Sequence, residues 1–349
     1  ANSDTSSTLQ DATIVHTQPR QTDLTYGWGI AVQDGAVLEG ERLRVSHNHD
    51  VGLFMAEPGA QATFKDLTLT DTQPQQSDMN YGRGVSIQSG AVLEGERLRV
   101  SHNHELGLFV ADEGTRATFK DLIVTETQPQ QSNLTGGAAI AVQVGAVLEG
   151  ERLFLSHNHD LGLFVANPGT RAMVHDLIVT DIQPQQSDRA NGRGISVQSG
   201  GVFEGERVLL SHNYEVGLFV ARQGTQATVR DLTTIHTQPR VFDDRGGTAV
   251  VVIEQATAHL EWFELTDNAL AGLLVASGGS LTGQQGTVRD NFVGLNIQTD
   301  PFDLNGLDCV DIGFNCCGMS CEVSNCNVEY RDRPTPEASE LIGAVGIDR

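Results

Sequence analysis

The fold is decided by the stretch Ser46-His47-Asn48-His49-Asp50-Val51-Gly52-Leu53-Phe54, because near copies of it recur at a constant interval. The stretch returns at 101–109 and 156–164, at 211–219 with Tyr214 replacing the second histidine, and in a worn form at 266–274. Its glycine marks an interval of 55 residues, at positions Gly52, Gly107, Gly162, Gly217 and Gly272. An interval this constant indicates one structural unit that is stacked repeatedly.

Each 55-residue unit contains two turns of a coil, one of 23 residues and one of 32. Both turns contain short runs in which apolar residues alternate with polar ones, such as 43–45 and 67–69, with Gly and Asn at the bends. This pattern predicts an all-β fold, a parallel β-helix whose strands pair with their counterparts about 4.8 Å away along the axis. A helical repeat of the same length is disfavoured, because helix-breaking residues occur inside every unit.

The longer turn carries an extra polar segment rich in Pro, Gln and Asn, which is Gln73 to Tyr81 in the first complete unit. Equivalent segments begin at Gln18, Gln128 and Gln183 and, in altered form, at Gln238. Such segments do not belong in a core, so we expect a column of loops that project from one side.

Acidic residues outnumber basic ones, with 45 Asp and Glu against 22 Lys and Arg and a net charge of -23. This excess excludes nucleic acid and anionic membranes as expected partners and favours cation binding. No apolar run approaches the roughly 18 residues that a membrane-spanning helix needs, so membrane insertion is not expected.

The cysteines are confined to one short segment near the end of the chain. They are Cys309, Cys316, Cys317, Cys321 and Cys326. Their clustering predicts a small disulfide-bonded terminal element and an oxidising compartment, with one thiol left over. The competing interpretation is a zinc site, because the last three cysteines have tolerable ligand spacing.

Two columns of charged side chains emerge when Leu43 is placed over Leu67. The first column alternates in sign through Arg42, Asp66, Arg97, Asp121, Arg152, Asp176, Arg207 and Asp231. The second has nearly the opposite phase through Glu41, Lys65, Glu96, Lys120, Glu151, His175, Glu206 and Arg230. Opposite charges on adjacent strands stabilise by about 0.2–1 kcal/mol each, so these columns are interpreted as a lateral scaffold.

One bend of the coil carries a column of asparagines. The expected structural ladder consists of Asn48, Asn103, Asn158, Asn213, Asn268 and Asn291. Inward amides at such a corner bond to backbone groups and to the neighbouring coil.

The histidines and acids beside these asparagines are the candidate metal ligands. They are His47, His49, Asp50, His102, His104, Glu105, His157, His159 and Asp160. Two imidazoles with carboxylates, including Asp71 aligned with His47, suit a divalent zinc, copper or nickel ion. The alternative is a solvated turn whose histidines were carried along by duplication. No other cofactor is indicated.

Four phenylalanines, Phe54, Phe109, Phe164 and Phe219, lie between inward-facing neighbours and are expected to point outward. In adjacent coils the same column holds small residues, so the rings form a partly apolar stripe. We expect the projecting loops to cover this stripe; an exposed interaction surface is the alternative.

An enzyme would need a constellation that occurs once, whereas nearly every acid, His and Arg here belongs to a repeated column. The sequence contains none of the motifs G-x-S-x-G, H-E-x-x-H or Walker A. The chain is therefore expected not to be an enzyme, and no catalytic residue is assigned.

The pattern Leu43-x-Val45-x-x-Asn48 with Gly52-Leu53-x-Met55 resembles the right-handed parallel β-helix repeat proteins of the pectate-lyase-like superfamily. The ending Asp290 to Ile297, followed by a cysteine-containing tail, is similar to large secreted bacterial members of that group. The resemblance implies a right-handed parallel β-helix over residues 1–297 and a C-terminal cap and tail over 298–349. It implies no single activity, because the superfamily spans lyases, tailspikes, adhesins and structural solenoids.

The expected function is that of an extracellular or cell-surface rod with a structural or adhesive role. Residues 1–17 align with 56–72, so the chain begins in mid-coil. The expected partner is therefore a second copy, or a missing N-terminal part, paired end to end through strand edges. The alternatives are a β-helix that binds or cleaves polysaccharides, with surface glycans as partners, and a divalent-cation-binding surface module.

Overall fold

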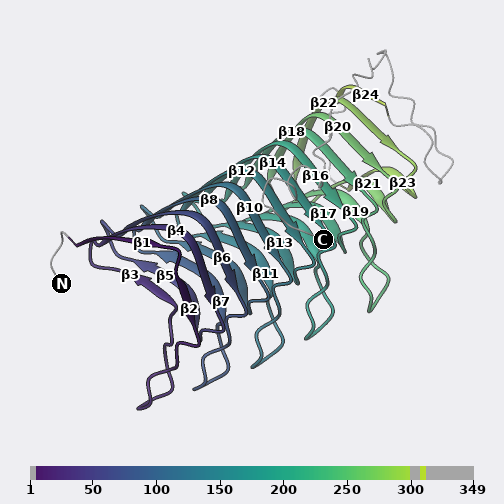
Figure 1. The fold of residues 1–349 in the computed structure, drawn as a ribbon. Helices are drawn as coiled ribbons and strands as arrows, with labels where there is room; N and C mark the ends of the chain where they lie inside the picture. Colours follow the sequence, from purple (N-terminus) through teal and green to yellow (C-terminus); the bar gives the residue numbers. More distant parts are fainter. Residues whose placement is uncertain (1–4, 299–306, 312–349) are drawn as a thin grey trace.

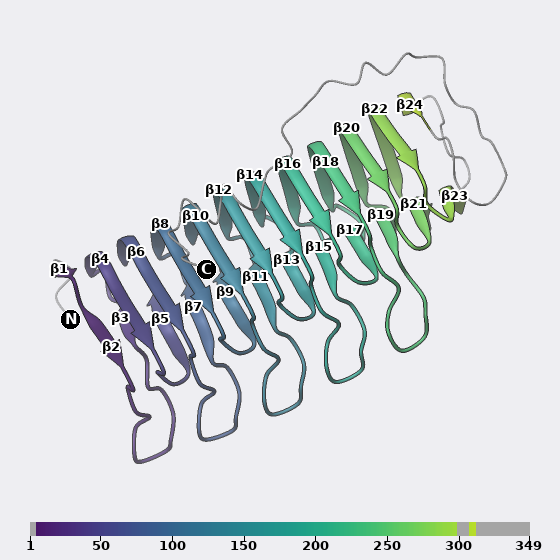
Figure 2. The ribbon, with the colours of Figure 1, turned by 45° about the vertical axis from the view of Figure 1, so that its right-hand side comes forward.

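The chain forms one elongated right-handed parallel β-helix (Figures 1 and 2). The computed structural model describes residues 5–298 and 307–311. Those residues form two parallel sheets and contain no helix. The predicted fold class is thus confirmed.

The larger sheet has 13 strands within the described residues, and neighbouring strands come from successive coils. These strands are β1 (Ser6–Gln10), β2 (Thr13–Val15), β4 (Val37–Ser46), β6 (Gln61–Thr70), β8 (Val92–Ser101), β10 (Arg116–Thr125), β12 (Val147–Ser156), β14 (Arg171–Thr180), β16 (Val202–Ser211), β18 (Gln226–Ile235), β20 (Thr257–Thr266), β22 (Ser280–Arg289) and β24 (Leu307–Asp311).

The smaller sheet has 11 strands in the same part of the chain, again in sequence order. They are β3 (Ile30–Val32), β5 (Val51–Ala56), β7 (Arg83–Gln88), β9 (Leu106–Ala111), β11 (Ala138–Gln143), β13 (Leu161–Ala166), β15 (Arg193–Gln198), β17 (Val216–Ala221), β19 (Thr248–Ile253), β21 (Ala271–Ala276) and β23 (Val293–Gln298).

One strand lies in the segment that the sequence assigned to the C-terminal cap. β24 pairs in parallel with β22 and so extends the larger sheet past residue 297. Cys309 lies in this strand. The other four cysteines, and with them the predicted disulfides and zinc alternative, lie outside the described residues.

The larger sheet is bent along a column of residues in the left-handed backbone region. In β4 and β6 the pairing runs from Glu41 opposite Lys65 directly to Leu43 opposite Leu67. The skipped residues, Arg42 and Asp66, have φ of 52° and 59°. This conformation turns the chain within the strand, so each coil has three faces around one core.

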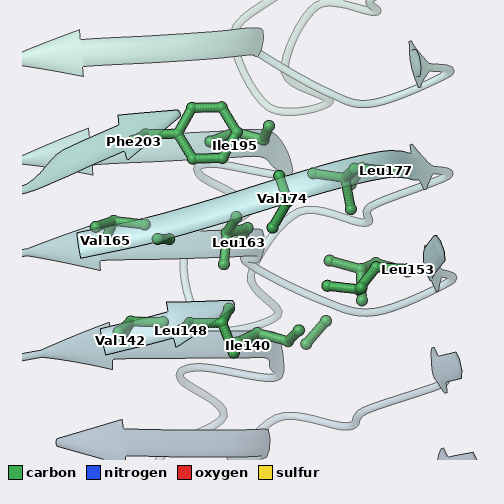
Figure 3. Close-up of a cluster of buried hydrophobic side chains, with 14 of the residues drawn as sticks. Ile140, Val142, Leu148, Leu153, Leu163, Val165, Val174, Leu177, Ile195 and Phe203 are labelled. Carbon is green, nitrogen blue, oxygen red and sulfur yellow. The ribbon is translucent and has the colours of Figure 1, made fainter. Parts of the chain in front are cut away.

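The core consists of the inward side chains of both sheets, as Figure 3 shows for β11 to β16. Phe64 is 1% exposed and lies opposite Gly40 and Gly95 on the adjacent coils. A Cβ on Gly40 would come within 2.4 Å of the Phe64 ring. Glycine in every second coil therefore makes room for a large side chain, which keeps the packing dense along the axis.

The polar insertions form a column of loops that project from one side of the helix (Figures 1 and 2). Their backbones are joined by Ser77 N donating to Leu24 O at 3.1 Å and Ser132 N donating to Met79 O at 3.2 Å. The next step repeats the contact, with Ser187 N to Leu134 O at 3.0 Å. The first four loops thus form one continuous wall.

Candidate functional site

The repeated His-Asn-His-acid bend connects the larger sheet to the smaller one, for example between β4 and β5. Its asparagines point inward, and all six are at most 2% exposed. In Asn158, Oδ1 accepts Thr127 N at 3.0 Å, while Nδ2 donates to Val124 O at 2.9 Å and Ser156 O at 3.1 Å. The amide therefore joins two coils and satisfies backbone groups at the corner.

The same acceptor bond recurs along the column at 2.9–3.2 Å. Its donors are the backbone amides of Thr17, Thr72, Thr127, Ile182, Thr237 and Asn268. Asn103 differs, because its Nδ2 is buried without a hydrogen-bond partner. Every asparagine of the ladder accepts a backbone amide, but Asn103 lacks the donated hydrogen bonds that Asn158 makes.

The second histidine of each bend is half-buried beside the loop wall. Its Nδ1 lies 3.1 Å from Pro74 O in His49, 3.2 Å from Thr72 O in His104 and 3.1 Å from Thr127 O in His159. Burial lowers the pKa of His104 and of His159. These rings therefore belong to the base of the loops.

The acid that ends each bend bonds to the segment that follows a loop. Asp50 Oδ2 accepts Trp28 Nε1 at 2.8 Å, and Glu105 accepts Arg83 Nε and Nη2 at 2.7 and 3.1 Å. Asp160 Oδ1 accepts an asparagine amide, Asn191 Nδ2, at 2.7 Å.

Burial raises the pKa of Asp50 and of Asp160, which both lack a bidentate arginine. Asp50 and Asp160 therefore differ from Glu105, whose charge is paired with that of Arg83 at 2.7 Å.

The candidate metal ligands are not brought together. Between residues 5 and 298 and in β24, no group of three His, Cys, Asp or Glu side chains is arranged to hold a metal ion. Successive residues at the bend diverge: His47 is exposed, Asn48 is buried, and the His49 ring lies against Pro74 of the loop. Within the described residues, the two histidines and the acid of one bend therefore do not converge on a common point.

The outward phenylalanines are half-buried under the second residue that follows a loop. Trp28 stacks on Phe54 with 4.3 Å between ring centroids. The Arg83 guanidinium lies 4.4 Å from the Phe109 centroid, and that of Arg193 lies 3.9 Å from the Phe219 centroid.

Phe109 and Phe219 are thus each covered by an arginine. At Phe164 the position of the covering residue is taken by Ala138, so this ring lacks the cation.

The first histidine of each bend belongs to a longer column along the outside of the corner. Its members, one per coil, are His16, His47, Asp71, His102, Glu126, His157, Asp181, His212, His236, Asp267 and Asp290, all with φ between 54° and 57°. His102 Nε2 lies 2.6 Å from Glu126 Oε2. The sequence reasoning missed His16 and His236 here, although they precede the aligned threonines by one residue.

The alternating Arg and Asp column resolves into pairs. Arg97 Nε and Nη2 donate to Asp66 at 2.6 and 2.9 Å, and Arg97 also contacts Glu96. Arg42 and Arg152 pair in the same way with Asp11 and Asp121. Each arginine thus uses the aspartate 31 residues before it rather than the one 24 residues after it.

An open groove of about 800 Å³ crosses the outer face of the larger sheet from β10 to β18. Polar side chains line it, among them Lys120, Glu151, His175, Glu206 and Arg230. His175 Nε2 lies 3.8 Å from Glu206 Oε2. These residues belong to the second charged column, which the sequence interpreted as scaffold.

This geometry defines the chain as a right-handed parallel β-helix with a side wall of loops. In the described residues, no helix has the length and apolar character to cross a membrane. No family model matches the sequence, and no curated protein matches it.

Two solved structures are similar to the chain. The crystal structure of the pectate lyase Pel9A aligns with 86% of this chain and 68% of its own, at 14% identity and a TM-score of 0.50. A TibC-catalyzed hyper-glycosylated TibA fragment aligns with 84% of this chain and 98% of its own, at 12% identity, but its TM-score is 0.24. The first likeness supports the fold alone.

Proposed function

We propose that this chain is a rigid β-helical rod of an extracellular structural or adhesive protein, and that it is not an enzyme. The observation that carries the proposal is the buried asparagine ladder, which joins coil to coil from Asn48 to Asn291. The 11 strands of the smaller sheet span about 48 Å at 4.8 Å per coil. Continuous side-chain ladders on a dense core resist bending, as a rod requires.

The ion pairs of the bent sheet support the same role. Most of the arginines at the bend clamp a preceding coil and also a neighbouring glutamate, as Arg97 does with Asp66 and Glu96. Charged residues that are paired in this way stiffen the larger sheet and keep its surface soluble. The clustered cysteines favour an oxidising, extracellular setting.

Small-angle scattering and electron microscopy test the rod. We expect particles about 48 Å long or longer, whose length does not change between low and high salt, because the asparagine ladder and the core are uncharged. A compact or flexible particle would contradict the proposal. Binding of the labelled protein to cells tests adhesion, and hydrolysis or lysis of acidic polysaccharides by the purified protein would overturn the non-enzymatic role.

A second candidate, polysaccharide binding, is favoured by exposed aromatic rings on the loop wall. Tyr26 and Tyr81 are 44% and 38% exposed and belong to adjacent loops, two coils or about 9.6 Å apart. Arg20 lies 5.0 Å from the Tyr26 centroid, and Arg83 lies 5.0 Å from that of Tyr81. Flat rings with a flanking donor suit the faces of sugars in surface glycans.

A glycan array separates the two candidates. Binding that is lost in Tyr26→Ala and Tyr81→Ala but kept in His175→Gln, in the charged groove of the larger sheet, would establish the loop wall as a glycan site. If the unaltered protein gives no signal on the array, polysaccharide binding is refuted and the structural rod remains as the proposal.

A further inference from the structure

At two places in the corner column, a histidine lies beside another histidine of the adjacent coil and not only beside carboxylates. The ring centroids of His16 and His47 are 5.1 Å apart, and those of His212 and His236 are 4.8 Å apart. Both pairs have an interplanar angle of 40°. The four side chains are exposed, so solvent ions reach them freely.

The spacing of these rings is that of two imidazoles on one metal ion. A metal–nitrogen bond of 2.0–2.1 Å places the ion about 3.2 Å from each ring centroid, so two ligands at 90–110° have centroids about 4.5–5.2 Å apart. The observed separations of 5.1 and 4.8 Å lie within this interval. The backbone fixes the separation, since His16 N bonds to Ser46 O at 3.2 Å and His212 N to Ile235 O at 3.2 Å.

The neighbours of each pair in the column are carboxylates. Asp71 follows His47, and Asp181 and Asp267 flank the pair formed by His212 and His236. With a net charge of -23, the chain attracts cations to this corner. Each site supplies two protein ligands, and water completes the coordination.

We propose that the pairs His16–His47 and His212–His236 are two binding sites for divalent transition-metal ions, with Cu²⁺ bound more tightly than Ni²⁺ or Zn²⁺. Imidazole suits all three ions, and the order follows their general affinity for nitrogen ligands. The inference stands independently of the rod, because it requires only two adjacent coils.

The chain contains its own control. His102 and His157 occupy the same column but face carboxylates in the adjacent coils, and His102 lies 2.6 Å from Glu126. His157 Nδ1 lies 2.5 Å from Ser156 Oγ. Each supplies one imidazole, so the chelate effect of a second ring is missing there.

The test is a calorimetric titration of the tag-free, cysteine-alkylated protein with Cu²⁺ delivered as its glycine complex at pH 7.5. We expect two ions per chain, one in His47→Gln, one in His236→Gln and none of comparable affinity in the double variant. His102→Gln and His157→Gln should keep two. At pH 5 the affinity should fall at least tenfold, because the imidazoles must lose their protons to bind.

Electron paramagnetic resonance gives a second readout, in which two equivalent nitrogens should couple to each ion. A double variant that still binds two ions, or an unaltered protein without saturable binding, would overturn the proposal. Because the four positions are exposed, the substitutions should leave folding intact, and unfolding curves of the metal-free variants check this directly.

Discussion

Asn158 Oδ1 accepts the backbone amide of Thr127, which lies 31 residues earlier and one coil away, at 3.0 Å. The same side chain donates to Val124 O and Ser156 O. Asn158→Ala would leave the buried Thr127 amide without its acceptor and remove the bonds to Val124 O and Ser156 O, although Ser156 O still accepts Glu126 N at 3.2 Å. We expect it to lower the free energy of unfolding by about 2–4 kcal/mol, measured by urea denaturation.

Asn103 is the matched control for that substitution. Its Oδ1 accepts Thr72 N at 3.0 Å, but its Nδ2 has no partner. Asn103→Ala should therefore cost less than Asn158→Ala. Equal losses would show that the ladder acts through side-chain volume and not through its hydrogen bonds.

Arg97 combines an ion pair with a strained backbone, since it clamps Asp66 and has φ of 55°. Arg97→Ala should destabilise by about 1 kcal/mol, because the pair is partly exposed. Arg97→Gly loses the same pair but relieves the left-handed strain, so it should be more stable than Arg97→Ala by about 1 kcal/mol. Thermal unfolding of both variants measures the order, and the reverse order would refute a strained bend.

The acids of the bend should respond with opposite signs when they are neutralised. The pKa of Asp160 is raised by burial, so in the folded state it is harder to ionise than in the unfolded chain. Its ionisation therefore reduces stability as the pH rises above the ordinary aspartate value, and Asp160→Asn should stabilise at pH 7 by about 1 kcal/mol.

Glu105→Gln is the control, because Glu105 holds Arg83 at 2.7 and 3.1 Å. This variant should destabilise at pH 7. The gain in Asp160→Asn should disappear near pH 3, where the unaltered carboxyl is protonated in both states. Chemical denaturation at both pH values measures the two effects.

Ala138 is the position at which the cover of the phenylalanine stripe is missing. Ala138→Arg should place a guanidinium over Phe164 and beside Asp160, as Arg83 does at Phe109 and Glu105. We expect a gain of about 1 kcal/mol in the free energy of unfolding. In this background Asp160→Asn should become destabilising. A double-mutant cycle without coupling would contradict the predicted ion pair between the introduced arginine and Asp160.

The second histidines should make the protein acid-sensitive. Burial lowers the pKa of His104 and His159, so the unfolded chain binds protons more readily than the folded one. Stability should therefore be complete above the unfolded histidine pKa of about 6.5 and should decline as the pH falls below it. His159→Gln should flatten the decline between pH 6.5 and 5, and an unchanged decline in this variant would contradict the prediction.

Much of the fold was predictable because it repeats along the chain. The 55-residue interval, the period-2 runs and the glycines at the bends predicted two coils per unit and the strand register. Asn158 and its equivalents were placed inward because alternation settles the direction of side chains within a strand. Phe54 was assigned outward on the same ground.

The contacts at the bends could not be predicted in this way. Alignment puts Asp66 and Asp121 on either side of Arg97, and only the turn of the backbone at φ of 55° decides that the arginine bonds to Asp66. Likewise Asp50 bonds to Trp28 and the His49 ring lies against Pro74 O, so these two side chains of one bend do not face each other.

The sequence by itself therefore determined the repeating β-helix, its core column and its loops, because these depend on periodicity along the chain. The tertiary structure alone decided which side chains meet across coils, including the pair formed by His16 and His47. The physical reason is that alignment of the coils places each of these side chains between two neighbours, and the sequence pattern does not say which of the two it meets. The left-handed bend then sets the direction in which each of those side chains points.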